Sequence, residues 1–202
     1  MEAKAAIFLD KDGTLIPDIP YNVNPGLTTL NPGVLEGLYE LQQHFSLFII
    51  SNQAGVAKGF FGIEEINRLM DYMLELFGRH YIHISGYYFC PHDVHGVISS
   101  YTLACNCRKP KPGLLLQAAA GHQLDLSKSW MIGDILNDVE AGKTAGCRSV
   151  LIDNGNEAEW DRAGEPFRTP DFIARDFLEA VSFIHQTTQE QNHVRKRYTQ
   201  PI

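Results

Sequence analysis

Short apolar runs alternate along this chain with longer segments in which apolar residues recur at helical spacing. The apolar runs lie at 5–9, 47–50, 87–89, 129–132, 149–152 and, more weakly, 172–174. The segments of helical periodicity lie at 32–44, 63–77, 112–122, 135–145 and 177–184. Strands joined through helices form right-handed βαβ units, which build a parallel sheet with helices on both faces. The sequence therefore predicts an α/β fold with a Rossmann-like, doubly wound parallel sheet.

The length of 202 residues suits one domain with a substantial core. We predict a single domain over 1–186, followed by a polar, mobile tail at 187–202. The apolar stretch 5–9 is too short for a signal peptide, and no apolar run approaches the ~20 residues of a membrane span. The net charge is −7, and basic residues cluster only at 195–197. We therefore expect a cytoplasmic monomer without a membrane or nucleic-acid partner.

The most specific motif is Asp10-Lys-Asp12-Gly-Thr, which comes directly after the first predicted strand. Two carboxylates in this spacing suit covalent phosphoryl transfer: one attacks phosphorus, and the other protonates the leaving oxygen and then activates water. Gly13 lets the chain turn sharply so that backbone N–H groups face a phosphate. A turn with two solvated carboxylates is the alternative, but the position after a buried strand favours the chemical interpretation.

Further polar motifs follow the other predicted strands. Ser51 and Asn52 end the second strand, where a hydroxyl and amides can hold a phosphoryl oxygen. Arg108 and Lys109 begin a proline-stiffened segment beyond the third strand, and a fixed Lys can neutralise charge on a transferring phosphoryl group. Because the carboxyl ends of parallel strands meet at one edge of the sheet, we expect these residues to lie together.

Gly133-Asp134 ends the fourth predicted strand, and Asp138 follows one helical turn later. Asp134 can coordinate magnesium, and Asp138 can act either as a ligand or as the partner of the motif lysine. Magnesium prefers a few carboxylates together with water and substrate phosphate, so Asp10 and Asp134 suffice as direct side-chain ligands. The sequence therefore predicts a magnesium-dependent phosphatase.

The motifs follow one another in the order D-x-D-G-T, a Ser after the second strand, K-P-x-P and G-D-x-x-x-D. With this ordered set, the chain resembles the haloacid dehalogenase-like (HAD) superfamily of phosphohydrolases over residues 5 to about 155. The resemblance implies that Asp10 is the nucleophile and Asp12 the general acid and base. It implies that Ser51 and Lys109 steady the phosphoryl group. Magnesium would be held by three residues of the chain, Asp10, Asp12 (through its backbone carbonyl) and Asp134.

Two short motifs, C-x-H and C-x-C, place three cysteines and a histidine within 18 residues. A Cys₃His set is common in structural zinc sites, and crowded cysteines in a cytosolic chain indicate metal rather than disulfides. The predicted ligands are Cys90, His92, Cys105 and Cys107. His95 is an alternative to the histidine of this set, while Cys147 is expected in the core. Zinc would staple the loop at about 90–107; unliganded buried cysteines are the alternative.

The segments C-P-H, C-N-C-R-K-P-K-P-G and S-N-Q look like the HAD branch of D-glycero-D-manno-heptose 1,7-bisphosphate phosphatases and related histidinol-phosphate phosphatases. This resemblance implies a minimal cap or none, and a small phosphorylated metabolite, a sugar bisphosphate, as substrate. Arg108 would contact the substrate beyond the reacting phosphate. Ile135 departs from the branch, where many members carry a polar or basic residue. Three alternative functions stay open: a phosphatase for histidinol phosphate or another small ester, a non-catalytic zinc-stabilised binding module, and a redox protein.

Overall fold

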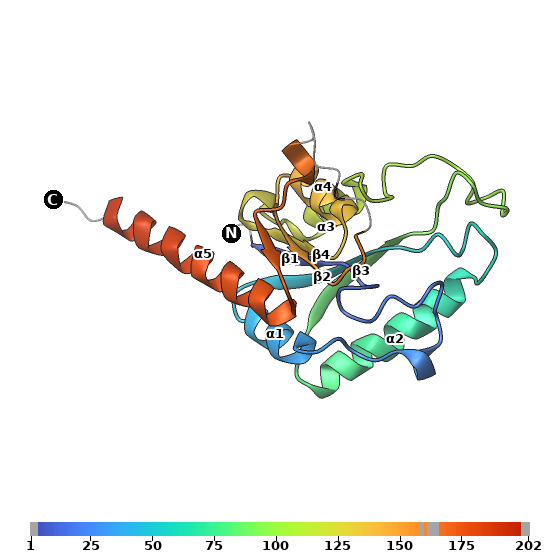
Figure 1. Cartoon of the computed structure of the whole chain (residues 1–202), viewed down its shortest axis with the longest axis horizontal. Coiled ribbons are helices and arrows are strands. Elements are labelled where there is room, and N and C mark those ends of the chain that lie inside the picture. Colours follow the sequence, from blue (N-terminus) through green and yellow to red (C-terminus); the bar gives the residue numbers. More distant parts are fainter. Residues whose placement is uncertain (1–3, 158–159, 161–165, 199–202) are drawn as a thin grey trace.

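The computed structural model describes residues 4–157, 160 and 166–198, and its centre is a six-stranded parallel sheet (Figure 1). The strand order is β3-β2-β1-β4-β5-β6. The strands are β1 (Ala6–Leu9), β2 (Ser46–Asn52), β3 (Ile84–Cys90), β4 (Trp130–Gly133), β5 (Arg148–Ile152) and β6 (Phe172–Ala174). The reversal of order beside β1 confirms the predicted doubly wound fold. It opens a crevice at the carboxyl ends of β1 and β4, the usual ligand position in such sheets.

Five α-helices in the described part of the chain connect and flank the strands. They are α1 (Val34–Leu41), α2 (Ile63–Arg79), α3 (Gly113–His122), α4 (Leu136–Ala145) and α5 (Phe177–Tyr198). Alternate strand residues face opposite layers. Ile7 and Leu9 pack with α1, α2 and α5, whereas Phe8 packs with α3 and α4. Figure 1 shows α1 and α2 on one side of the sheet and α3 and α4 on the other.

The first helix begins later than its sequence suggests. The periodicity at 32–44 predicts a helix from Pro32, with Asn31 as a suitable N-cap, but α1 starts at Val34, after Gly33 with φ +78°. The Asn31 side chain instead donates to the backbone carbonyls of Gly13 and Thr14, at 3.3 and 3.0 Å. A residue that would cap a helix locally therefore supports the turn that follows β1.

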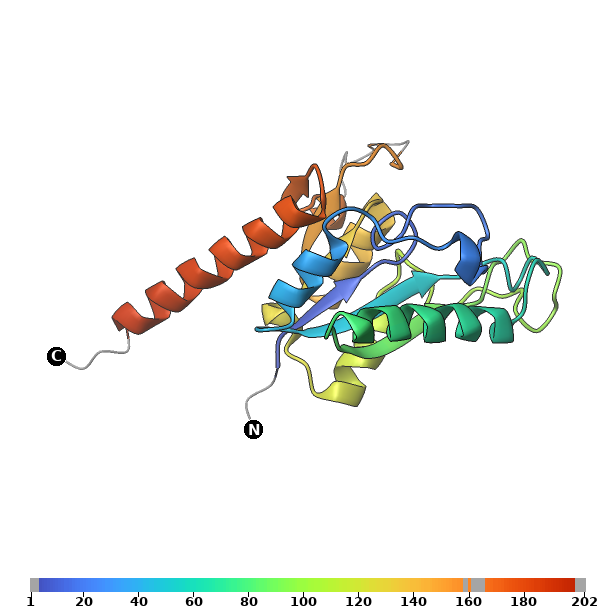
Figure 2. The same cartoon turned by 90° about the horizontal axis from the view of Figure 1, so that it is seen from below.

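The last helix corrects the prediction for the C-terminal segment. Helical structure was expected to stop near Ile184, with a frayed tail from about Thr187, yet α5 continues to Tyr198. The segment contains no Gly or Pro and is rich in Gln, Glu, Lys and Arg, which favour helix even without packing. Figures 1 and 2 agree that the C-terminal half of α5 extends away from the sheet.

The described chain contains no separate cap domain. At the carboxyl edge of the sheet, the connections 10–33, 53–62 and 91–112 form loops with short turns. Within the described residues, no helix combines the length and apolar character that a membrane span requires. Loops from three strands therefore form the walls around the ends of β1 and β4.

Candidate active site

Asp10 and Lys109 form a buried ion pair where β1 ends. The Lys109 ammonium contacts the Asp10 carboxylate, lies 2.6 Å from Asp138 Oδ1, and donates to the Ile50 carbonyl at 3.0 Å. Burial alone would lower the pKa of Lys109, but the Asp10 and Asp138 carboxylates more than reverse this and raise it above its ordinary value. Lys109 therefore remains a fixed cation beside Asp10, as expected, while Lys111 binds the Cys105 carbonyl outside the site.

Asp12 lies next to this pair and is held through both of its carboxylate oxygens. The Lys11 ammonium is 2.5 Å from Asp12 Oδ1, and Gln53 Nε2 donates to Asp12 Oδ2 at 3.0 Å. Burial, and to a lesser degree the Asp10 charge, raises the pKa of Asp12 against the lowering effect of Lys11. A raised pKa brings a carboxyl group closer to the range in which it can both donate and accept a proton.

Asp134 reaches the same site from the end of β4. Gly13 has φ +90°, and a Cβ atom there would lie 2.0 Å from Asp134 Oδ2, so only glycine permits this approach. Thr14 Oγ1 donates to Asp134 Oδ1 at 3.2 Å, and Asn156 Nδ2 donates to Asp134 Oδ2 at 2.7 Å. Burial, followed by the Asp10 and Asp138 charges, raises the pKa of Asp134 to about 8.

The carboxylates of Asp10, Asp134 and Asp138 fit a divalent cation. One oxygen of each lies within 4.8 Å of the others, and all three are buried. Lys109 neutralises only one of these charges, so the cluster carries excess negative charge that a hard cation would offset. The Asp12 side chain lies outside this triad.

We expect Asp134→Asn to stabilise the metal-free protein at alkaline pH and to abolish stabilisation by magnesium. A folded-state pKa raised to about 8 means that ionisation of Asp134 opposes folding, so wild-type stability should fall between about pH 4 and pH 8. The uncharged variant lacks this penalty, so its stability advantage over the wild type should grow as the pH rises through this window. Urea unfolding in a chelator, then with magnesium, measures both effects; a pH-independent difference would contradict the assignment.

Ser51 and Asn52 lie at the end of β2, but the structure gives them different contacts. Ser51 Oγ is buried and accepts from Gln53 Nε2 at 2.7 Å. The Asn52 amide donates to the Lys109 carbonyl and accepts from the Lys109 N–H, both at 3.0 Å. Asn52 therefore fixes the backbone that carries Lys109.

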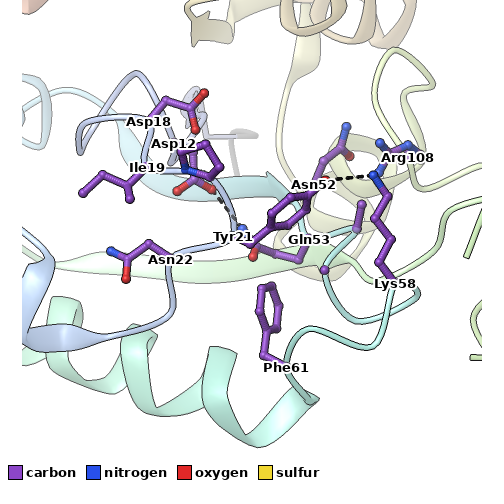
Figure 3. A pocket seen from close by; sticks show the side chains of 13 residues that line it. Asp12, Asp18, Ile19, Tyr21, Asn22, Asn52, Gln53, Lys58, Phe61 and Arg108 are labelled. Carbon is purple, nitrogen blue, oxygen red and sulfur yellow. Dashed lines mark hydrogen bonds between the residues drawn. The ribbon is translucent and has the colours of Figure 1, made fainter. Parts of the chain in front are cut away.

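Two adjoining cavities open above these residues and share Asp12, Asp18 and Asn52 as lining residues. The smaller, about 190 Å³, is lined by Asp10, Asp12, Asp18, Asn52, Lys109, Asp134, Ile135, Asp138 and Asn156. The larger, about 320 Å³, extends away from it over the residues drawn in Figure 3. Figure 3 shows Asp12 and Asp18 toward one end and Lys58 and Arg108 at the other. The smaller cavity suits a phosphoryl group and the larger one the rest of a substrate.

The predicted zinc ligands form a compact cluster beside this pocket. The cysteine sulfurs lie 3.1 to 3.5 Å apart, and His92 Nδ1 is 3.2 Å from Cys107 Sγ and 3.6 Å from Cys90 Sγ. No disulfide joins the cysteines of the described chain. His92 rather than His95 lies in the cluster. The donors match a Cys₃His zinc site, and Cys147 lies in the core as expected.

We expect elemental analysis to find about one zinc ion per chain in addition to exchangeable magnesium. Cys105→Ser should lower both the zinc content and the midpoint of thermal unfolding, because the loop has few apolar residues of its own. Cys147→Ser is the matched control: it removes a thiol from the core and should leave the zinc content unchanged. Folded wild-type protein that contains no zinc, or a disulfide within the cluster, would contradict this prediction.

Sequence reasoning missed several residues of the site. Lys58, Asp18 and Tyr21 line the larger cavity from loops without a recognisable motif. Asn156 binds Asp134 from the loop after β5, and Gln53 bridges Ser51 and Asp12. Gln53 had a usable signal, because it directly follows Ser51 and Asn52 at a strand end.

The site combines a buried candidate nucleophile paired with a lysine, an adjacent acid and base, and a cluster of carboxylates. At the carboxyl edge of a Rossmann-like sheet, this combination defines the class of HAD-like phosphatases. The HAD-hydrolase-like family model matches residues 106–180. The chain is 36% identical to D-glycero-beta-D-manno-heptose-1,7-bisphosphate 7-phosphatase from Yersinia pestis over 74% of its length and 81% of the relative's. For the Escherichia coli K12 protein of the same name the values are 33%, 77% and 86%.

A solved structure of a heptose bisphosphate phosphatase has the same fold. The D,D-heptose 1,7-bisphosphate phosphatase from B. bronchiseptica, in complex with magnesium and phosphate, superposes with a TM-score of 0.77 at 27% identity. The superposition covers 91% of this chain and 99% of that one. The chain therefore belongs to the HAD-like family and is a phosphatase.

Proposed function

We propose that this phosphatase removes the 7-phosphate from a D-glycero-D-manno-heptose 1,7-bisphosphate through a magnesium-dependent phosphoaspartate mechanism. The names of its relatives support the substrate. The observation that carries the proposal is the 320 Å³ cavity, which leads from Asp12 to Arg108. A sugar with one phosphate at each end requires such a second cationic group at a distance from the first.

In the proposed reaction, an Asp10 carboxylate oxygen forms a bond to phosphorus while the bond from phosphorus to the sugar oxygen breaks. Asp12 gives its proton to that leaving oxygen. It then takes a proton from the water that attacks phosphorus, which breaks the bond to Asp10 and releases inorganic phosphate. Lys109 and the Ser51 hydroxyl hold the phosphoryl oxygens.

Asp10, Asp134 and the backbone carbonyl of Asp12 would hold magnesium, which when bound neutralises charge on the phosphoryl group. The zinc cluster has a structural part in the proposal: Arg108 and Lys109 directly follow Cys107, so zinc would fix the segment that presents both. The carboxylates of Asp10, Asp134 and Asp138 are present together with Lys109. This supports a catalytic function rather than that of a zinc-stabilised binding module.

A heptose bisphosphate is strongly charged and does not diffuse across a lipid bilayer, so we place the enzyme with its substrate in the cytoplasm. We propose that it acts as a monomer without a nucleic-acid partner, in keeping with a net charge of −7. Sedimentation velocity tests the first of these points, and a stable dimer would overturn it.

We expect Arg108→Lys to reduce kcat/KM for the heptose bisphosphate by about 10- to 100-fold, because Lys cannot reproduce the planar, two-pronged contact of a guanidinium with phosphate. Hydrolysis of an aryl phosphate should change little, since Asp10, Ser51 and Lys109 still hold the reacting group. Phosphate release from both substrates, and from histidinol phosphate, measures the preference. Equal losses on the bisphosphate and the aryl phosphate, or a wild-type preference for histidinol phosphate, would overturn the proposed substrate.

A further inference from the structure

Asp93 is a nearly buried carboxylate that contacts two cations outside the reacting site. Its side chain is 10% exposed, and its Oδ2 atom lies 3.5 Å from Arg108 Nη2 and 3.9 Å from Lys58 Nζ. Arg108 comes from the end of the cysteine loop, whereas Lys58 belongs to the loop between β2 and α2. One carboxylate oxygen therefore connects two basic side chains from different parts of the chain.

The backbone around Asp93 fixes the position of this carboxylate. Its Oδ1 atom accepts a hydrogen bond from the His95 N–H at 2.9 Å, and its own N–H donates to the Tyr101 carbonyl at 3.2 Å. The Ala57 carbonyl accepts from the N–H groups of Val97 and Ile98, at 2.7 and 2.9 Å. The segment that carries Lys58 is thus hydrogen-bonded to the same loop that carries Asp93.

Both cations line the larger cavity, whereas Asp93 does not and instead lines a second cavity, which Arg108 also borders. Lys58 Nζ also donates to the Tyr21 hydroxyl at 2.8 Å, and Arg108 Nη1 donates to the His92 carbonyl at 3.3 Å. In Figure 3 the two basic groups lie at the end of the cavity away from Asp12. Each side chain keeps further N–H groups for a ligand.

We propose that Asp93 is a positioning residue that holds Lys58 and Arg108 together as a paired anion site for the second phosphate of the substrate. This inference rests on the proposed bisphosphate substrate and adds Lys58 and Asp93 to the determinants of specificity. Both basic side chains have many rotamers, and fixing them before the ligand arrives removes part of the entropic cost of binding.

Charge alone makes the opposite prediction. With Asp93 ionised, the three groups carry one positive charge in excess, and without it they carry two. If Asp93 acted only through its charge, its neutralisation would strengthen the attraction for a phosphate. If it positions the cations, neutralisation weakens phosphate binding despite the added positive charge. The direction of the change therefore separates the two roles.

The test compares heptose 1,7-bisphosphate with heptose 7-phosphate, which lacks the second anion. We expect Asp93→Asn to lower kcat/KM for the bisphosphate by about 5- to 30-fold, mainly through KM, and thereby to reduce the preference for the bisphosphate. Asp71→Asn, which removes an exposed carboxylate from α2, is the matched control and should leave the preference unchanged. Zinc content and thermal unfolding midpoint establish that each variant is folded.

A second arm uses Lys58→Met. This variant should lose part of the same preference, and adding Asp93→Asn to it should cost less than Asp93→Asn costs in the wild type, because the two residues act as a unit. A wild-type preference that survives or rises in Asp93→Asn would overturn the positioning role alone. A wild-type enzyme with no preference for the bisphosphate would instead overturn the proposed substrate, and the anion site with it.

Discussion

Asp10→Asn should reduce turnover by several orders of magnitude while leaving the fold intact. The amide has nearly the shape of the carboxylate but lacks the charge and nucleophilicity needed to attack phosphorus. Asp10 contacts Lys109 directly, and no other carboxylate occupies its place at the end of β1. Lys109 Nζ also lies 2.6 Å from Asp138 Oδ1. The buried ammonium therefore retains a carboxylate partner in the variant, which should stay folded.

The matched control for this variant is Asp153→Asn. Asp153 follows β5 as Asp10 follows β1, but its side chain is exposed and lines neither of the two cavities of the site. Its neutralisation should leave kcat/KM nearly unchanged. Steady-state phosphate release, single-turnover kinetics and far-ultraviolet circular dichroism together separate lost chemistry from lost structure. Near-normal turnover in a folded Asp10→Asn protein would contradict covalent catalysis at this residue.

The fold followed from sequence wherever apolar pattern and burial agree. The edge strand β6 at Phe172–Ala174 lies where the pattern placed it, and α4 ends at Ala145, as its periodicity predicted. The pattern failed where tertiary contacts compete with local preference. Asn31 is recruited by the turn after β1 instead of capping α1. The sequence of α5 beyond Ile184 is largely polar, so a search for amphipathic periodicity does not detect its continuation.

The site was predictable as far as its residues follow strands, because topology alone brings strand ends together. Asp10, Asp134 and Lys109 therefore came from pattern and spacing. Lys58 and Asn156 did not, because the paths of their loops depend on contacts made elsewhere, such as the hydrogen bonds of Ala57 with the cysteine loop. Loop residues that complete a site carry no periodicity, so sequence reasoning has no means of finding them.

Asp12→Asn should slow hydrolysis of the heptose bisphosphate by about 10²–10⁴-fold, because the variant can neither protonate the leaving sugar oxygen nor activate water. The side chain is held by Lys11 and Gln53, and Asn can keep the contact with Gln53 through its own carbonyl. The variant should therefore bind substrate with little change in affinity. An effect confined to KM would mean that Asp12 serves binding rather than proton transfer.

A comparison of leaving groups tests the two proton transfers separately. A nitrophenolate leaves without protonation, so with nitrophenyl phosphate the first step in Asp12→Asn should remain comparatively fast. Hydrolysis of the phosphoaspartate on Asp10 still needs a base, so this second step should become limiting. The expected result is a burst of nitrophenol about equal to the enzyme concentration, followed by slow turnover, with the phosphoenzyme visible by mass spectrometry after rapid acid quenching. An acid and base that acts in both steps makes the first step sensitive to the leaving group and leaves the second step indifferent to it. Hydrolysis of both substrates that is slowed equally, without a burst, would therefore assign Asp12 to a different role.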